Sequence, residues 1–281
     1  MDDSAVTVRE ALAQAASALS AAGVDTPSVD AEWLLAHVLD RTRTQLELER
    51  TRVLTDDERR SYADFVERRA RREPLAYVLG EWGFRGLTLS VDARVLVPRP
   101  ETEVVVERCL ELVDPIAEPR VLDVGVGSGA IALAIAIEHR GAHVVGVDSS
   151  EGALALAEEN RARSGMDGRV RLVHGDLLAG QSGPFDLVVS NPPYVVAEEW
   201  DRLQPEIRLY EPRTAVVGSD VAETIAREAQ PVLGRGGWLV LEAGDRQARE
   251  LAETLRALGY EDVTISRDLA GRERVVEGRR P

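Results

Sequence analysis

Beyond about residue 100, short apolar segments of strand length alternate with segments of helical periodicity. Strands are predicted near 120–124, 142–147, 169–173, 185–190, 237–242 and 260–265, with helices between most of them. This alternation predicts a largely parallel sheet with helices on both faces, which is the α/β class. The late segments 262–266 and 274–277 flank a polar stretch and are expected to pair antiparallel at the sheet edge, which makes the sheet seven-stranded.

The chain is expected to divide near residue 80. Residues 1–79 are predicted to form a small all-helical domain, and residues 80–99 a linker. Within this linker, residues 84–97 alternate apolar and polar side chains with a break near 92–93, which predicts a β-hairpin. Residues 100–281 form the predicted α/β domain. A chain of 281 residues is long enough for each domain to bury its own core.

Helix start and stop signals support the helical domain. Thr7 and Glu10 have the spacing of a capping box, and Gly23 is expected to end the helix that follows. Pro27 is expected to begin a second helix, and Thr55 to cap a later one.

The composition favours an intracellular protein. Neither a charged leader with an apolar core nor an apolar run of about 18 residues is present, so the cytoplasm is expected and a membrane is not. The one cysteine, Cys109, cannot form an internal disulfide and is expected to be a packed thiol. Because His37, His139, His143 and His174 are scattered, no metal site is predicted.

The formal net charge is -15, and every basic residue other than histidine is arginine. An anionic protein repels nucleic acid at long range, so no direct nucleic-acid partner is expected. Residues 41–72 are rich in arginine, but acidic residues are mixed among them. A solvated helix surface is the favoured interpretation, with a docking face for a protein or ribonucleoprotein as the alternative.

The segment Val121–Ala132 has the pattern of a strand, a glycine-rich turn and the start of a helix. Its Asp-x-Gly-x-Gly-x-Gly spacing differs from the Gly-x-Gly-x-x-Gly of dinucleotide folds, where the helix N-terminus binds a pyrophosphate. The next predicted strand ends in Asp148, whose carboxylate can bind both hydroxyls of a ribose. A nucleoside without phosphates suits these residues, and S-adenosylmethionine is the predicted cofactor. A turn with a purely structural role is the alternative.

Ligands of such sheets bind beyond the carboxyl ends of the strands. Asp176 is expected to accept a hydrogen bond from the adenine amino group and Leu177 to contact the ring, although an ordinary turn explains this pair equally well. The glycine turn, Asp148, Asp176 and Asn191 all follow predicted strand ends and should line one cleft. The predicted cofactor-binding residues are Gly125, Val126, Gly127, Ser128, Gly129, Asp148, Asp176, Leu177 and Asn191.

Asn191, Pro192, Pro193 and Tyr194 follow the predicted strand 185–190. The two prolines keep this segment stiff and extended. The Asn191 side-chain oxygen and a proline carbonyl can accept the two N–H groups of a planar amide or aromatic amine, and this grip tightens as the nitrogen gains positive charge. Asn191, Pro192 and Tyr194 are the predicted catalytic residues, and all four are predicted to contact the substrate. A proline-rich turn without chemistry is the alternative.

With these motifs the chain resembles the HemK (PrmC) family of peptide-chain release factor glutamine methyltransferases. The resemblance rests on residues 97–103, the glycine turn, residues 191–194 and residues 211–213, and it extends to residues 30–35 and 73–80. It implies a Rossmann-like methyltransferase domain dependent on S-adenosylmethionine, preceded by a helical domain that helps to dock the substrate. It also implies that residues 99–102 lie near the methionine end of the cofactor.

The reaction implied by the resemblance is transfer of a methyl group to N5 of the glutamine in the Gly-Gly-Gln motif of release factors, which act in translation termination. A monomer is expected. Three alternatives remain open: an adenine-N6 methyltransferase of nucleic acid, a glutamine methyltransferase of a ribosomal protein, and a cofactor-binding protein without catalysis. Val126 departs from the threonine that is common in the family and removes a hydroxyl near the cofactor carboxylate.

Overall fold

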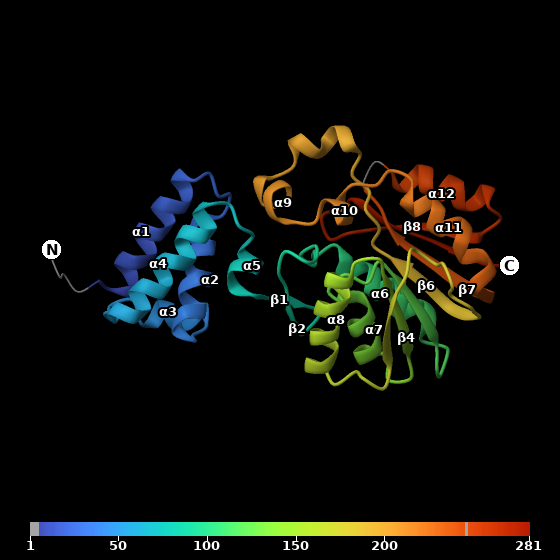
Figure 1. Ribbon diagram of the computed structural model, residues 1–281, viewed down its shortest axis with the longest axis horizontal. Coiled ribbons are helices and arrows are strands. Elements are labelled where there is room, and N and C mark those ends of the chain that lie inside the picture. The colour runs from blue at the N-terminus through green and yellow to red at the C-terminus, as the bar shows by residue number, and fades with distance from the viewer. Residues whose placement is uncertain (1–5, 245–246) are drawn as a thin grey trace. The chain divides into compact units, whose positions relative to one another are not determined.

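The computed structural model describes residues 6–244 and 247–281 (Figure 1). The chain forms two compact units that are not contiguous in sequence. One ends at Gly80 and also includes Gln204–Tyr210, and the other consists of Glu81–Leu203 and Glu211–Pro281. Residues 204–210, which the sequence analysis assigned to the α/β domain, therefore belong to the helical unit. Residues 1–5 of the predicted helical domain lie outside the described residues.

The first unit is all-helical, as predicted. Its helices are α1 (Val8–Ala21), α2 (Pro27–Leu39), α3 (Arg43–Leu48), α4 (Asp56–Ala70), α5 (Leu75–Leu79) and α9 (Pro205–Tyr210). Thr7 and Thr55 form the predicted capping boxes with Glu10 and Glu58, and Thr42 forms another. Leu34 and Leu35 of α2 are fully buried in the core of this bundle.

Buried ion pairs hold α9 within the helical unit. Arg69 donates from Nε to Asp30 Oδ2 at 2.7 Å and from Nη2 to Glu206 Oε1 at 2.9 Å. Arg72 donates to both carboxylate oxygens of Glu206, at 2.8 and 2.7 Å. Burial alone would raise the pKa of Glu206, but the hydrogen bonds from Arg72 and Arg69 outweigh it and lower this pKa. The Tyr210 hydroxyl adds a hydrogen bond to the Arg71 carbonyl at 2.9 Å.

A two-stranded hairpin begins the second unit, with strands β1 (Glu81–Phe84) and β2 (Leu87–Ser90). The hairpin itself was predicted, but its predicted turn near 92–93 is wrong. The turn lies at Arg85 and Gly86, which both have positive φ, as in the two-residue turns that suit the twist of a hairpin. The residues after β2 run without strand structure, although Val91, Val95 and Val97 are buried.

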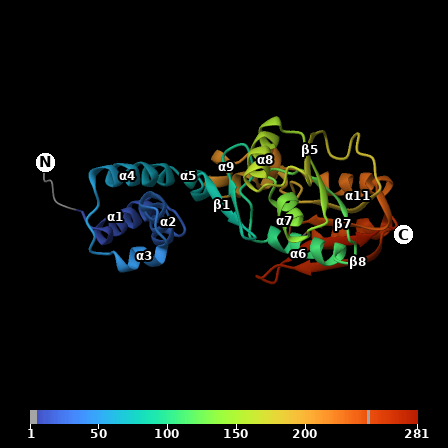
Figure 2. The same ribbon diagram turned by 90° about the horizontal axis from the view of Figure 1, so that it is seen from below.

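The main sheet has seven strands, as predicted, in the order β5-β4-β3-β6-β7-β9-β8. Figures 1 and 2 show this sheet among its helices in two views. Pairs from β5 to β7 are parallel, whereas β9 is antiparallel to both of its neighbours, as expected for the late segments. The strands are β3 (Arg120–Val124), β4 (His143–Asp148), β5 (Val170–His174), β6 (Phe185–Ser190), β7 (Leu233–Glu242), β8 (Glu261–Arg267) and β9 (Glu273–Arg279). The helices of this unit are α6 (Thr102–Val113), α7 (Ala130–Glu138), α8 (Glu151–Arg163), η1 (Ala197–Arg202), α10 (Arg213–Val216), α11 (Val221–Val232) and α12 (Ala248–Ala257).

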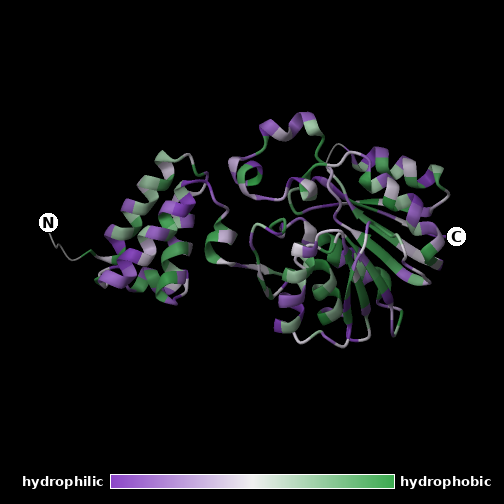
Figure 3. Cartoon of the chain, viewed as in Figure 1, coloured by the Kyte–Doolittle hydropathy of each residue, from purple (hydrophilic) through white to green (hydrophobic). Residues whose placement is uncertain are grey.

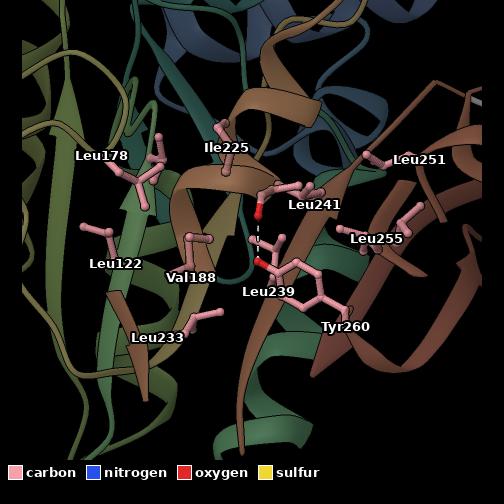
Figure 4. Close-up of a cluster of buried hydrophobic side chains, with 14 of the residues drawn as sticks. Leu122, Leu178, Val188, Ile225, Leu233, Leu239, Leu241, Leu251, Leu255 and Tyr260 are labelled. Carbon is pink, nitrogen blue, oxygen red and sulfur yellow. Dashed lines mark hydrogen bonds between the residues drawn. The ribbon is translucent and has the colours of Figure 1, made fainter. Parts of the chain in front are cut away.

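Hydrophobic residues concentrate on the strands of this sheet (Figure 3). On one face, Leu122, Val188 and Leu239 share a core with side chains of α11 and α12 (Figure 4). The Tyr260 hydroxyl lies in that core and donates to the Ala226 carbonyl at 2.8 Å. Parallel strands are apolar where helices cover the sheet, and the helices α11 and α12 cover this face.

Helices α6 and α7 cover the opposite face. Asp123 points to that face and accepts from the Ala132 backbone at 3.0 Å, at the start of α7. Glu277 of β9 likewise points there and accepts from Arg108 of α6 at 2.7 Å. Cys109 of α6 is fully buried, which confirms the predicted packed thiol, and burial raises its pKa well above the ordinary value. Among the described residues, no helix has both the length and the apolar character needed to cross a membrane.

Candidate active site

The candidate site is a cavity of about 320 Å³ at the carboxyl ends of the parallel strands. Strand order reverses between β3 and β6, and ligands of open α/β sheets bind at such a switch point. Of the predicted residues, the lining includes Gly125, Val126, Gly127, Ser128, Asp148, Asp176, Leu177, Asn191 and Pro193. Arg99 and Thr102 also line it, and they are the two ends of the segment 99–102 that the family resemblance placed near the methionine end of the cofactor.

The glycine turn between β3 and α7 is held by backbone hydrogen bonds to the neighbouring strand. The backbone N–H groups of Gly125 and Val126 both donate to the Val147 carbonyl, at 2.8 and 2.9 Å. Gly125, Gly127 and Gly129 all have positive φ, which explains why glycine occupies each of these positions. The turn therefore has a fixed shape that brings its backbone to the cavity wall.

Asn160 of α8 anchors the same turn from the other side. This side chain is 1% exposed, and its Nδ2 donates to the Ser128 carbonyl at 2.9 Å and to the Ser90 carbonyl at 3.0 Å. Its Oδ1 accepts from the Ser90 backbone at 2.7 Å. Asn160 thus joins the glycine turn to the hairpin. Asn160 was not among the predicted site residues, because an asparagine inside a helix carries no signal of a contact so distant in sequence.

Asp148 lies at the end of β4, as predicted. Its Oδ2 accepts from the Gly127 backbone at 2.9 Å and its Oδ1 from the Ser150 backbone at 2.9 Å. These contacts orient the carboxylate at the cavity, where it can also receive hydroxyl groups of a ligand. Asp176 and Leu177 follow β5 and complete this wall, and Leu177 has a positive φ of 49°.

Asn191 follows β6 and belongs to a chain of side-chain hydrogen bonds. Its Nδ2 lies 3.1 Å from Thr102 Oγ1, and that hydroxyl donates to Glu242 Oε2 at 2.7 Å. Thr102 begins α6, and Glu242 ends β7. Burial is the main cause that raises the pKa of Glu242 to about 7. Glu242 was not among the predicted site residues.

Three predicted residues do not line the cavity. Gly129 is the residue before α7, and its φ of 85° lies in the left-handed region that favours glycine, so the backbone conformation explains the residue at this position. Pro192 is buried, and Tyr194 is half-buried. The Tyr194 carbonyl accepts from Gln247 Nε2 at 2.9 Å. Burial, helped by the charge of Glu242, raises the pKa of Tyr194 to about 12, so its hydroxyl stays protonated at neutral pH.

An ion pair borders the cavity next to Thr102. Arg99 Nη2 donates to both carboxylate oxygens of Glu211, each at 2.7 Å. Glu211 is buried, so the guanidinium compensates a charge that has left water. Arg99 and Pro212 both line the cavity, and the pair therefore joins two motifs that are distant in sequence. Among the residues with described positions, no cluster of histidine, cysteine and carboxylate side chains could hold a metal.

The doubly wound sheet and the glycine-turn cavity define the class of Rossmann-like methyltransferases. The methyltransferase small domain family matches residues 102–205, and the PrmC N-terminal domain family matches residues 10–80. A 16S rRNA N2 G1207 methyltransferase from T. thermophilus, solved with AdoMet and guanosine, has the same fold, with a TM-score of 0.52 and 19% identity over 72% of this chain and 50% of that chain.

Two curated relatives specify the family. A release factor glutamine methyltransferase of Deinococcus radiodurans is 44% identical over 97% of this chain and 98% of its own. One of Caulobacter vibrioides is 40% identical over 97% of this chain and 96% of its own. The chain belongs to the family of release factor glutamine methyltransferases, which confirms the resemblance found from the motifs.

Proposed function

We propose that this protein transfers the methyl group of S-adenosylmethionine to the side-chain nitrogen N5 of the glutamine in the Gly-Gly-Gln motif of peptide chain release factors. One observation carries the proposal: Asn191 reaches the cavity beside the glycine turn in a chain 44% identical to a release factor glutamine methyltransferase. A small cavity with a carboxylate and a turn of glycines suits a nucleoside without phosphates.

The cavity residues fit S-adenosylmethionine. Asp148 is proposed to bind the ribose hydroxyls. Asp176 is proposed to accept from the adenine amino group, Leu177 to contact the adenine ring, and Val126 to lie near the cofactor carboxylate. The remaining proposed cofactor contacts are Gly125, Gly127, Ser128, Gly129 and Asn191. When bound, the cofactor supplies an electrophilic methyl group on a sulfonium.

The acceptor amide nitrogen is a poor nucleophile, because its lone pair is delocalised into the carbonyl. We assign its binding to Asn191 Oδ1 and the Pro192 carbonyl, which accept its two N–H groups. Both acceptors interact more strongly as the nitrogen gains positive charge, and this difference lowers the barrier. Pro193 keeps the segment rigid, and Tyr194 is proposed to place its ring beside the acceptor amide. Alignment of the nitrogen with the methyl group contributes much of the remaining acceleration. As the nitrogen–methyl bond forms, the sulfur–methyl bond would break to leave S-adenosylhomocysteine, and the methylated nitrogen would lose one proton to water.

The helical domain predicted at residues 1–79 is proposed to help dock the release factor.

The protein is further proposed to act as a cytoplasmic monomer that makes no direct contact with nucleic acid. Its net charge of -15 supports the absence of nucleic-acid contact. Light scattering of the purified protein tests the oligomeric state. Cross-linking to a release factor, followed by peptide mapping, tests the docking assignment, and cross-links confined to residues 81–203 and 211–281 would contradict it.

The decisive experiment incubates the purified protein with labelled S-adenosylmethionine and a release factor, with RNA and DNA in parallel. Label on the Gly-Gly-Gln glutamine, located by mass spectrometry, is expected. A release factor with that glutamine replaced by alanine is the matched control and should stay unlabelled. Label on adenine would place the protein among nucleic-acid methyltransferases instead, and label on a ribosomal protein would replace the proposed substrate.

Asn191→Ala tests the acceptor residue directly. Removing one preorganised hydrogen-bond partner of a transition state costs about 100- to 1,000-fold in kcat, and we expect a loss of this size in methyl transfer. Affinity for S-adenosylhomocysteine, measured by calorimetry, should fall far less than kcat. Unchanged methyl transfer would remove Asn191 from the proposed mechanism.

A further inference from the structure

Three polar side chains from three separate elements form one continuous hydrogen-bonded chain. Glu242 is 0% exposed, and Thr102 is 4% exposed, so the central bond is shielded from water. The Thr102 hydroxyl donates to Glu242 Oε2 at 2.7 Å, and Asn191 Nδ2 donates to Thr102 Oγ1 at 3.1 Å. Within the described part of the chain, Glu242 Oε1 has no hydrogen-bond partner. A buried carboxylate with one oxygen unmatched is costly, so its presence here calls for a reason beyond stability.

The direction of this chain follows from the chemistry of its members. An ionised carboxylate can only accept hydrogen bonds, and a hydroxyl has a single proton to donate. Once Thr102 donates that proton to Glu242, its oxygen can only accept from Asn191. The NH2 group of Asn191 must then face Thr102. The other end of the same amide, Oδ1, therefore faces away from Thr102.

We propose that Glu242, acting through the Thr102 hydroxyl, is a positioning residue that fixes the Asn191 amide with Oδ1 directed at the acceptor nitrogen. This proposal rests on the proposed function, because only a substrate N–H requires an oxygen at that place. Without Glu242 the two ends of an asparagine amide are nearly equal in shape, and an amide presented the other way round places two donors against the donors of the substrate. Such a pairing is repulsive and unproductive.

Protonation of Glu242 permits the reverse direction. A protonated carboxyl can donate to Thr102, whose hydroxyl can then donate to Asn191 Oδ1 and turn the amide over. The charged and titratable groups around Glu242 are Glu101 and Arg99 before α6, Arg274 of β9, and Tyr194 after β6. Burial raises the pKa of Glu242 most, Glu101 adds to this effect, and the Thr102 hydrogen bond, Arg274 and Arg99 oppose it, with a resulting pKa of about 7. We therefore expect kcat to fall as the pH drops through about 7.

The test compares methyl transfer to a release factor by the full-length protein and its variants. Thr102→Val removes the hydroxyl at nearly constant volume. We expect kcat to fall about 10- to 100-fold, as when a partner that orients a metal ligand is lost. Thr102→Ser keeps the hydroxyl and should recover most of that loss. Glu242→Gln should lower kcat about 10-fold and abolish the acid limb of the pH profile. Its affinity for S-adenosylhomocysteine should stay within about twofold, because Glu242 does not line the cavity.

Glu277→Gln is the matched control. Glu277 of β9 is also a buried carboxylate, 2% exposed, and it accepts from the Thr264 hydroxyl at 2.9 Å. It does not line the cavity, so this variant should lose stability but keep the kcat and pH profile of the wild type. Melting temperatures of all variants distinguish a loss of kcat caused by unfolding from one caused by a misoriented Asn191 amide.

Two further readouts distinguish positioning from a general structural role. In an Asn191→Ala background, Thr102→Val and Glu242→Gln should cause no additional loss of kcat, because the group that they orient is gone. In NMR spectra, the side-chain NH2 resonances of Asn191, identified from the Asn191→Ala spectrum, should move in the Glu242→Gln protein and stay in place in the Glu277→Gln protein. The second readout requires no turnover.

The outcomes separate the two proposals. A wild type that does not methylate release factors would overturn the proposed function, whatever the variants do. A wild type that does so, together with folded Thr102→Val and Glu242→Gln proteins that keep wild-type kcat and its acid limb, would overturn the positioning role alone. Additive losses in the Asn191→Ala background would also overturn it.

Discussion

At the scale of single residues, Asp148 has two roles that a substitution can measure. Its carboxylate holds the Gly127 backbone and faces the cavity, where the ribose hydroxyls are proposed to bind. We expect Asp148→Ala to weaken binding of S-adenosylhomocysteine by about 10- to 100-fold, the usual effect of losing hydrogen bonds to a charged group. Calorimetric titration measures this.

Asp186→Ala is the control for Asp148→Ala. Asp186 also accepts from a backbone N–H, that of Arg120 at 2.8 Å, but it lies near the start of β6 and does not line the cavity. Replacing Asp186 should leave the affinity for S-adenosylhomocysteine within about twofold of the wild type. Equal losses in the two variants would mean that Asp148 acts only through the fold.

Two buried carboxyl groups make stability depend on pH. Burial is the largest cause that raises the pKa of both Asp123 and Glu242 to about 7. Their pKa in the unfolded chain is near the ordinary values of about 4, so between about pH 4 and 7 the folded protein binds more protons than the unfolded chain. The stability that they contribute is complete below their unfolded pKa and is lost as the pH rises through about 7.

Urea denaturation at pH 5 and pH 8 tests this dependence. We expect the wild type to be less stable at pH 8, by a few kcal/mol at most, because a pKa that differs by one between the folded and unfolded states corresponds to about 1.4 kcal/mol. Glu242→Gln cannot ionise, so it should lose less stability between the two pH values. The idea is wrong if the wild type and this variant show the same change.

Residue types alone revealed only part of the site. Glycines with positive φ, a carboxylate at a strand end and an asparagine before two prolines each have a local signature, and they lie at the cavity as predicted. Thr102 and Glu242 are 140 positions apart, and Glu242 is simply the last residue of an apolar strand in the sequence. Their contact depends on tertiary packing, which no local pattern reports.

At the scale of elements, β4 and the glycine turn fit together through a single glycine. A Cβ at Gly146 would lie 2.7 Å from Val126 Cγ2 and 3.1 Å from Leu172 Cδ2. We expect Gly146→Ala to displace Val126, distort the turn and weaken binding of S-adenosylhomocysteine by about 10-fold, since overpacking of this kind typically costs about 1–3 kcal/mol. Titration calorimetry measures the change.

A second substitution identifies the cause. Val126→Ala in the Gly146→Ala protein removes the clashing methyl groups and should restore much of the affinity. Gly168→Ala is the matched control, because nothing lies within 4 Å of a Cβ at that glycine, and it should behave as the wild type. The Val126→Ala single variant supplies the reference affinity, because Val126 is itself a proposed cofactor contact. A double variant much weaker than that single variant would show that Leu172, not Val126, transmits the effect.

Strands with a clear apolar pattern and helices with capping residues could be predicted from the sequence, but the position of the hairpin turn could not. The strand predicted at 185–190 has the bounds of β6, and the capping boxes at Thr7 and Thr55 are present. The hairpin turn places an arginine, Arg85, in the left-handed region, which asparagine, aspartate and glycine usually occupy. The apolar alternation continues past β2 because Val91, Val95 and Val97 are buried without forming a strand.

At the scale of the whole molecule, the helical unit takes part of its structure from a distant stretch of chain. A network of four ion-paired side chains joins α9 to the rest of this unit and carries no net charge: Asp30, Arg69, Arg72 and Glu206. Arg69 and Asp30 are almost fully buried. Glu206→Gln leaves one buried positive charge uncompensated, so we expect a loss of about 1–3 kcal/mol from the helical unit. Hydrogen exchange measured by mass spectrometry should show faster exchange in peptides from residues 56–80.

The exposed Glu199 supplies the control for Glu206. Glu199→Gln changes the same charge in the same region of sequence, outside the buried network, and should leave the exchange of residues 56–80 unchanged. Because hydrogen bonds from Arg72 and Arg69 lower the pKa of Glu206, its contribution is present above the unfolded pKa and is lost as the pH falls through the folded one. Equal exchange in both variants at neutral pH would contradict a stabilising role for Glu206.

The membership of α9 in the helical unit also bears on how the gene can be cut and recombined. The PrmC N-terminal domain family ends at residue 80, yet the partner of Arg69 and Arg72 lies at position 206. A fragment cut at that boundary would leave two arginines without their shared carboxylate. A chimera that replaces residues 1–80 alone would keep Glu206 but lose Arg69 and Arg72, so the incoming domain has to bring arginines that match Glu206 or be transferred together with Gln204–Tyr210.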